Sequence, residues 1–165
     1  MLELSEIKVE VDRLAHRIGA SGCVLPTYGS TDDGAKPHIE TDVRGYHYVV
    51  VERGKELRRI TTRDLGELLF HIFEAVTFSL ACDYELSHHV ESQDRRRMIF
   101  RRQSELLAVL SREWSDRASR QHEQILREHP YDDLANARVN LANQVGWKAA
   151  CEKYPLPTNS SVNQK

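Results

Sequence analysis

The clearest candidate for chemistry is a short run of alternating polar and apolar residues. His38 and Glu40 lie two positions apart, and His47 follows after a turn signal. Two imidazoles and one carboxylate form the ligand set of a facial metal site, and such a site would make the protein a small metal-dependent hydrolase. The three side chains meet only in one strand register, because successive residues of a strand point to opposite faces.

The turn between the two strands decides this register. If Asp42 lies opposite Tyr46, His47 points to one face of the sheet and His38 and Glu40 point to the other. A shift by one residue would bring the three groups together. We favour the first register, in which the polar groups lie on the exposed face of a hairpin. We therefore expect neither a metal site nor a cofactor.

A cluster of arginines, Arg95 to Arg97 with Arg101 and Arg102, is typical of phosphate binding. Nucleic-acid binders usually carry such a cluster on a net basic domain, whereas this chain has a formal net charge of −2. The preceding segment, residues 61–91, is acidic and offers internal partners. We expect an ion-paired helix face, and a nucleic-acid-associated protein stays an alternative.

Motifs of covalent catalysis do not occur in the sequence, which has neither Gly-x-Ser-x-Gly nor a glycine-rich phosphate loop. Glu85 and His89 have the four-residue spacing of a surface contact on a helix. Cys23, Cys82 and Cys151 are far apart and form no Cys-x-x-Cys pair, which argues against a zinc site or a disulfide framework. Reduced cysteines are typical of the cytoplasm.

The elements that must position these groups centre on residues 45–86. β-branched and aromatic residues predict a strand at 46–51, and Arg53-Gly54 predicts a turn to a second strand at 56–60. A long apolar helix follows, with Thr61 or Thr62 as its N-cap. Such a hairpin and helix would form the folding nucleus.

The flanking segments complete an α+β fold. An amphipathic helix runs from Leu4 to Ile18 and ends at Gly19. A long loop with a short strand near Val24 leads to a strand at 38–41. The predicted fold is an N-terminal helix, a small antiparallel β-meander of three to four strands and a C-terminal bundle of about four helices. Its last three helices are predicted to start at Asp94, at Ser111 and at Asp132 or Asp133, the last running to Tyr154.

Length and hydropathy predict one domain over residues 1–154 and a disordered polar tail over residues 155–165. Acidic residues in the first turn of the chain argue against a signal peptide. No uncharged apolar stretch reaches the length of a membrane span, so we expect no membrane partner.

Four ordered blocks carry a family resemblance. They are LPTYGSTDDGAKPHIETDVRGYHYVVVERG, TTRDLGELLFHIFEAVTFSLACDYEL, DRRRMIFRRQSELLAVLSREW and EHPYDD. They resemble immunity protein family 63 of bacterial polymorphic toxin systems, and the resemblance covers roughly Cys23 to Asp133. The resemblance implies a cytoplasmic, non-enzymatic protein whose partner is a cognate toxin domain, with no nucleic acid involved. It leaves the oligomeric state open.

Under this resemblance, the contact surface is predicted on rigid polar elements. The first candidate is the polar side of the hairpin and its turns, because strand placement and aromatic or charged groups suit an interface. Its residues are His38, Glu40, Tyr48, Glu52 and Arg53. The acidic helix is the alternative surface, with Glu74, Asp83 and Glu85.

Overall fold

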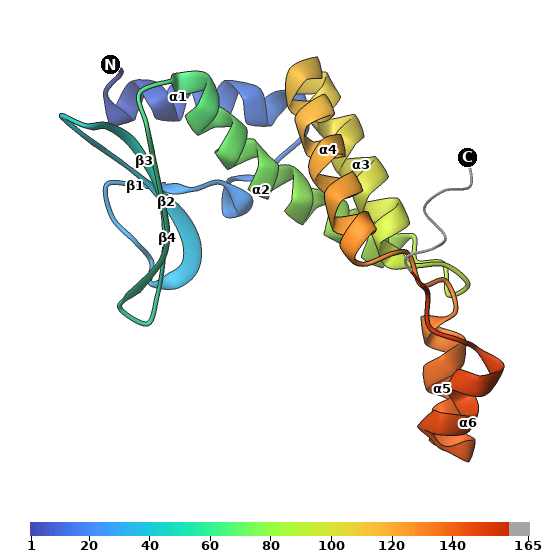
Figure 1. Cartoon of the computed structure of the whole chain (residues 1–165). Coiled ribbons are helices and arrows are strands. Elements are labelled where there is room, and N and C mark those ends of the chain that lie inside the picture. Colours follow the sequence, from blue (N-terminus) through green and yellow to red (C-terminus); the bar gives the residue numbers. More distant parts are fainter. Residues whose placement is uncertain (159–165) are drawn as a thin grey trace.

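The computed structural model describes residues 1–158 and has an α+β architecture (Figure 1). A helix precedes a four-stranded sheet, and further helices follow it. A short 3-10 turn, Gly22–Val24, leads into the sheet. The elements are α1 (Leu4–Arg17), β1 (Thr27–Tyr28), β2 (Gly34–Asp42), β3 (Gly45–Glu52), β4 (Lys55–Thr62), α2 (Leu65–Ser87), α3 (Arg95–Leu110), α4 (Arg112–Glu128), α5 (Ala135–Val145) and α6 (Trp147–Lys153).

The first helix ends as its sequence predicts. Gly19 lies just beyond the C-cap with φ +66°, and its N–H donates to the carbonyl of His16. The N–H of Ala20 donates to the carbonyl of Ala15, which completes a Schellman motif. One face of α1 is buried through Ile7, Val11, Leu14 and Ala15, and it covers the junction between the sheet and the later helices.

The sheet has the order β1-β2-β3-β4 and is mixed, so the prediction of a purely antiparallel meander is wrong in one respect. β2, β3 and β4 form the predicted antiparallel meander, but β1 pairs with β2 in parallel. The fourth strand lies at Thr27–Tyr28, whereas Val24 belongs to the 3-10 turn. The long loop reaches the sheet from the side of α1, and its two extended residues run alongside β2.

The register between β2 and β3 differs by one residue from the favoured prediction. Asp42 pairs with Gly45, and Glu40 therefore pairs with His47. Gly45 has φ +143°, and a Cβ there would lie 2.3 Å from the carbonyl oxygen of Thr62, so this close approach requires glycine. The shift places His38 with Glu40 and His47 on one face, the outer face. Ile39, Tyr46 and Tyr48 occupy the opposite, inner face, which packs against α2.

Helix α2 is the central element of the core. Asp64, not a threonine, is its N-cap, since its carboxylate accepts from the N–H of Glu67 and the Thr62 hydroxyl accepts from the N–H of Asp64. Phe73 is fully buried, and Ile72 and Val76 are almost so. Among residues 1–158, α2 alone has the length and composition of a membrane-spanning helix. The core helices of soluble proteins share this property.

Helix α3 packs against α2, and α4 packs against α3 (Figure 1). The carboxylate of Asp94 and the hydroxyl of Ser111 cap α3 and α4, as predicted. Trp114 of α4 stacks on Phe73 with ring centroids 6.1 Å apart and meets Phe70 edge-on at 6.4 Å. The aromatic cluster therefore joins α4 to the centre of the sheet-covered core.

Helices α5 and α6 replace the single last helix that the sequence predicts. Gly146 has φ +89° and separates them. The pair extends away from α2, α3 and α4 instead of joining a bundle of four (Figure 1). Arg138 is 2 % exposed and donates to Asp132 and to the carbonyls of Tyr154 and Pro155. Most of the predicted disordered tail, residues 159–165, lies outside the described residues.

Candidate functional site

The outer face of the sheet assembles the polar groups that the sequence singles out, but it pairs them with one another. His38 is 3 % exposed, and its Nε2 lies 3.1 Å from Glu40. Arg59 donates to the other oxygen of Glu40 at 2.8 Å and also binds Glu56. The Arg59 guanidinium, followed by His38, holds the pKa of Glu40 below its ordinary value. Glu40 is therefore an ionised member of a ladder across β2 and β4.

His47 has separate partners on the same face. Its Nδ1 lies 2.8 Å from the Thr61 hydroxyl, and its Nε2 lies 2.8 Å from Asp42. The guanidinium of Arg44, and then His47, hold the pKa of Asp42 far below its usual range. In residues 1–158, no group of three His, Cys, Asp or Glu side chains is placed to hold one metal ion. The observed register brings His38, Glu40 and His47 to one face. There His38 pairs with Glu40, and His47 pairs with Thr61.

Burial separates the predicted toxin-binding residues into two groups. His38 and Tyr48 are each 3 % exposed, so the expectation that they lie on an exposed hairpin face is wrong. Glu85 is 1 % exposed and is bound by Arg95 and His89. These three side chains have little surface to offer a partner. Accessible surface belongs to the others, which are Glu40, Glu52, Arg53, Glu74 and Asp83.

Glu52 and Arg53 lie at a braced hairpin tip. Arg53 and Gly54 have φ of +53° and +71°, the geometry of a two-residue turn that fits the twist of the strands. The loop before β2 supports this turn, because Asp33 accepts from the N–H of Gly54 at 2.7 Å. The tip therefore holds its side chains on a fixed backbone.

The arginine cluster is largely satisfied within the chain. Arg95 binds Glu85 of α2, Arg96 binds Asp94, and Arg97 binds Asp133. Arg102 lies over the ring of Tyr84 at 5.0 Å and contacts Glu105. The predicted pairing with the acidic helix α2 is therefore made by Arg95, whereas Arg96 and Arg97 pair with carboxylates outside that helix. These arginines hold α3 to α2 and to the segment before α5.

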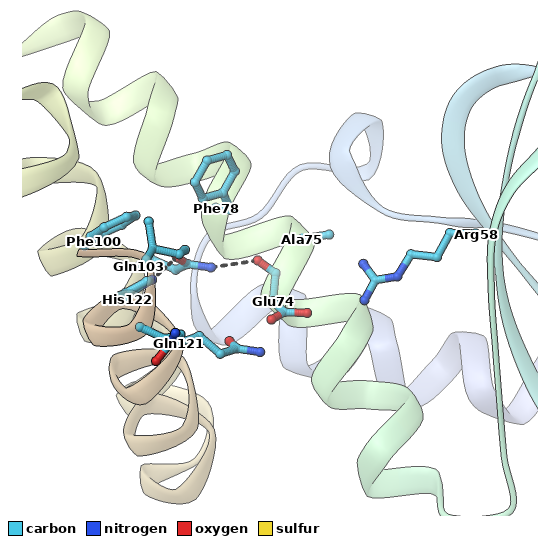
Figure 2. A pocket seen from close by; sticks show the side chains of 10 residues that line it. Arg58, Glu74, Ala75, Phe78, Phe100, Gln103, Gln121 and His122 are labelled. Atoms are coloured by element: carbon cyan, nitrogen blue, oxygen red, sulfur yellow. Dashed lines mark hydrogen bonds between the residues drawn. The ribbon is translucent and has the colours of Figure 1, made fainter. Parts of the chain in front are cut away.

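Glu74 opens onto a groove that the sequence does not predict. Its volume is about 540 Å³, and it lies between the inner side of β4 and helices α2, α3 and α4 (Figure 2). The residues that line it are Arg58 of β4; Glu74, Ala75 and Phe78 of α2; Phe100 and Gln103 of α3; and Gln121, His122, Gln124 and Ile125 of α4.

A hydrogen-bonded chain fixes the back of this groove. His122 stacks on Phe100 with ring centroids 4.0 Å apart, and its Nε2 lies 2.8 Å from the oxygen of Gln103. The amide nitrogen of Gln103 donates to the backbone carbonyl of Glu74 at 3.0 Å (Figure 2). Burial lowers the pKa of His122, so the ring is neutral at pH 7. The back of the groove therefore presents amide and neutral imidazole groups.

The front of the groove carries opposite charges. Burial raises the pKa of Glu74, but hydrogen bonds from His71 and Gln121 outweigh it and hold that pKa below its ordinary value. Arg58 reaches from β4 toward Glu74 (Figure 2). Its guanidinium also lies over the Tyr48 ring, 5.7 Å from the centroid. No carboxylate of residues 1–158 lies within ion-pair distance of Arg58. Glu74 thus has neighbours that stabilise its charge, the Arg58 guanidinium among them, whereas Arg58 forms no direct ion pair within residues 1–158.

A second, smaller cavity also lies against α2. Its volume is about 250 Å³, and Ala75 lines both cavities. Lys36, Pro37 and Tyr48 supply its sheet side. Two apolar side chains at the larger cavity add exposed apolar surface. Phe78 is 45 % exposed, and Ile125 is 40 % exposed. The two cavities offer concave surface with both polar and apolar groups, as recognition sites in proteins do.

A family model for Immunity protein 63 matches residues 42–124, which is half of the chain. The chain therefore belongs to the immunity protein 63 family, as its four sequence blocks indicate. No curated protein and no solved structure matches it. The matched residues include every residue that lines the larger cavity except Ile125.

Sequence reasoning found only Glu74 among the groove residues. The others have no motif, because the groove joins strand and helix residues that are far apart in the chain. Phe78 gave one usable signal. It lies off the apolar stripe of α2, and a large apolar residue outside the buried stripe can mark a contact surface.

Proposed function

We propose that this protein neutralises a cognate toxin domain by binding it in the bacterial cytoplasm, without catalysis. Membership of the immunity protein 63 family carries the proposal. The polymorphic toxin system would supply the partner, and the inhibitor would act by covering a toxin surface. A standard interface buries about 800 Å² on each partner, which is within reach of a 19.0 kDa chain.

The side chains also suit binding better than turnover. The outer-face histidines, His38 and His47, are buried and bound to neighbours. The groove and the hairpin tip instead combine rigid backbone with accessible charged and aromatic groups, the types that anchor protein interfaces. Glu52, Arg53 and Glu74 belong to this surface, which extends from the hairpin tip to the groove.

Co-expression with the toxin domain encoded by the neighbouring gene tests the proposal. Toxin activity should fall in proportion to added protein and reach its minimum near one molecule per toxin, and the two chains should co-elute in size-exclusion chromatography. Protection at strongly substoichiometric amounts, without a complex, would identify an enzyme that modifies the toxin or its product. Toxin activity that is unaffected by excess protein would rule the pairing out.

A further inference from the structure

Strand β4 is an open edge of the sheet beside the groove. It is the last strand in the order β1-β2-β3-β4. No other strand in residues 1–158 pairs with the edge of β4 that points away from β3. Its residues from Lys55 to Arg59 are exposed. An open edge presents unpaired N–H and C=O groups to another extended chain. Arg58 belongs both to this edge strand and to the groove.

Protection against aggregation explains part of this edge. Charged residues and a register shift between Val50 and Val51 are the usual devices that blunt an edge strand. A second copy of β4 would place two strands of net positive charge side by side, because each carries Lys55, Arg58 and Arg59 against a single Glu56, and like charges disfavour this pairing. Protection against strand pairing does not explain Arg58, because its side chain lines the adjoining cavity instead of pointing away from the edge into solvent.

The positive charge of the β4 edge indicates that its ligand is acidic. Arg59 is already bound by Glu40 and Glu56. Arg53, Lys55 and Arg58 have no ion-pair partner in the described part of the chain, and they follow one another from the hairpin tip to the groove. The matching ligand is an extended segment with a carboxylate at the level of Arg58. Backbone pairing would give such a segment its affinity, and the groove would give it specificity.

We propose that an acidic extended segment of the toxin adds to the free edge of β4 and places a carboxylate against Arg58 at the mouth of the groove. The inference rests on the proposed function, whose partner it describes. Phe78 and Ile125 then contact the apolar part of the same segment. Eight residues of β4, at about 3.3 Å per residue, give an edge long enough for a short partner strand.

The first test measures affinity for the purified toxin domain encoded by the neighbouring gene. Arg58→Glu should weaken binding by about 100-fold or more, because it sets two like charges in a desolvated contact. Lys8→Glu is the matched control, an exposed cation of α1 that belongs neither to β4 nor to the groove and whose surface pair with Asp12 contributes little, and it should bind within about twofold of the parent. Changing the responsible toxin carboxylate to arginine should restore binding to Arg58→Glu.

The second test follows backbone amides by hydrogen exchange in the complex. Those amides of residues 55–62 that point away from β3 should gain protection that the free protein lacks. Parent-like binding by Arg58→Glu would overturn the carboxylate contact, and unchanged exchange in β4 would overturn the strand addition. Both results are compatible with an inhibitor that binds elsewhere. A parent protein that does not bind the toxin would instead overturn the proposed function, and this inference with it.

Discussion

Two phenylalanines of α2 show how one residue type serves two purposes. Phe73 is fully buried and stacks on Trp114, whereas Phe78 is 45 % exposed at the mouth of the groove. They lie five positions apart, so the helix turns their side chains to different directions. The first supports the core, and the second is surface that a monomer does not need.

Replacing each phenylalanine by alanine should distinguish the core residue from the surface residue. Phe73→Ala should lower the free energy of unfolding by about 3–5 kcal/mol, because it leaves a cavity under Trp114. Urea unfolding at pH 7 measures this value. Phe78→Ala is the matched control and should cost less than about 1 kcal/mol. Equal losses for the two variants would show that α2 is not buried as described.

Glu85 is the buried charge whose ionisation should matter for stability. It is 1 % exposed. Burial raises its pKa, but hydrogen bonds from His89 and Arg95 outweigh this and leave the pKa below its ordinary value of 4.5. Because the folded pKa is lower than the unfolded one, the stabilisation is present above about pH 4.5 and is lost as the pH falls through the folded pKa.

Glu85→Gln should therefore destabilise the protein in a pH-dependent way. At pH 7 we expect a loss of about 1–2 kcal/mol, at the lower end for charged hydrogen bonds because Arg95 is half exposed and screened by solvent. The difference from the parent should shrink below about pH 4.5. Urea titrations at pH 7 and pH 3.5 measure it, with exposed Glu105→Gln as the control. A difference that is independent of pH would contradict the assigned ionisation.

At the scale of elements, the sequence predicts what local signals determine. Asp94 and Ser111 are N-caps as predicted, because a short polar side chain before an apolar run satisfies the first N–H groups of a helix. The predicted register of β2 and β3 is wrong by one residue, since the close approach of Gly45 to Thr62 is a tertiary contact. The sequence does not predict the groove for the same reason. Packing alone brings Arg58, Glu74 and His122 together.

The α5–α6 pair depends on one buried arginine instead of an apolar core. Arg138 joins the start of the pair at Asp132 to its end at Tyr154 and Pro155. Within residues 1–158, the two apolar clusters of the chain include no residue of α5 or α6. The element is thus held by hydrogen bonds to a side chain that no other residue type can replace.

Arg138→Ala should unfold this pair while the rest of the chain keeps its structure. Amide signals of residues 135–153 should lose their dispersion in NMR spectra, and proteases should cleave there first. Signals of β3 and α2 should stay in place. Arg127→Ala, at an exposed arginine of α4, is the control and should leave α5 and α6 intact. Loss of signals throughout the chain would show that the pair supports the whole fold.

At the scale of the whole molecule, the proposed binding surface and the α5–α6 pair are separate features. The larger cavity is completed by Ile125 of α4, and the family match ends at residue 124. The pair extends away from the sheet and from α2, α3 and α4, which contribute residues to the groove (Figure 1). It nevertheless exposes large apolar residues, which are Val139 at 50 %, Val145 at 56 % and Trp147 at 55 %. Two surfaces therefore compete as toxin contacts, and the chain allows them to be tested apart.

A shortened chain of residues 1–134 should still bind and neutralise the toxin. It keeps the groove and β4, and it keeps Asp132 and Asp133, which hold the start of α3 through Asp94 and Arg97. We expect a melting temperature within a few degrees of the parent. The Kd should lie within about threefold of the parent, which is a difference in binding free energy below about 1 kcal/mol. Calorimetry measures the melting temperature, and titration of toxin activity measures the binding. Arg58→Glu in the shortened chain is the control and should abolish protection. A folded chain of residues 1–134 that binds more than about tenfold more weakly would place part of the toxin contact on the apolar residues of α5 and α6.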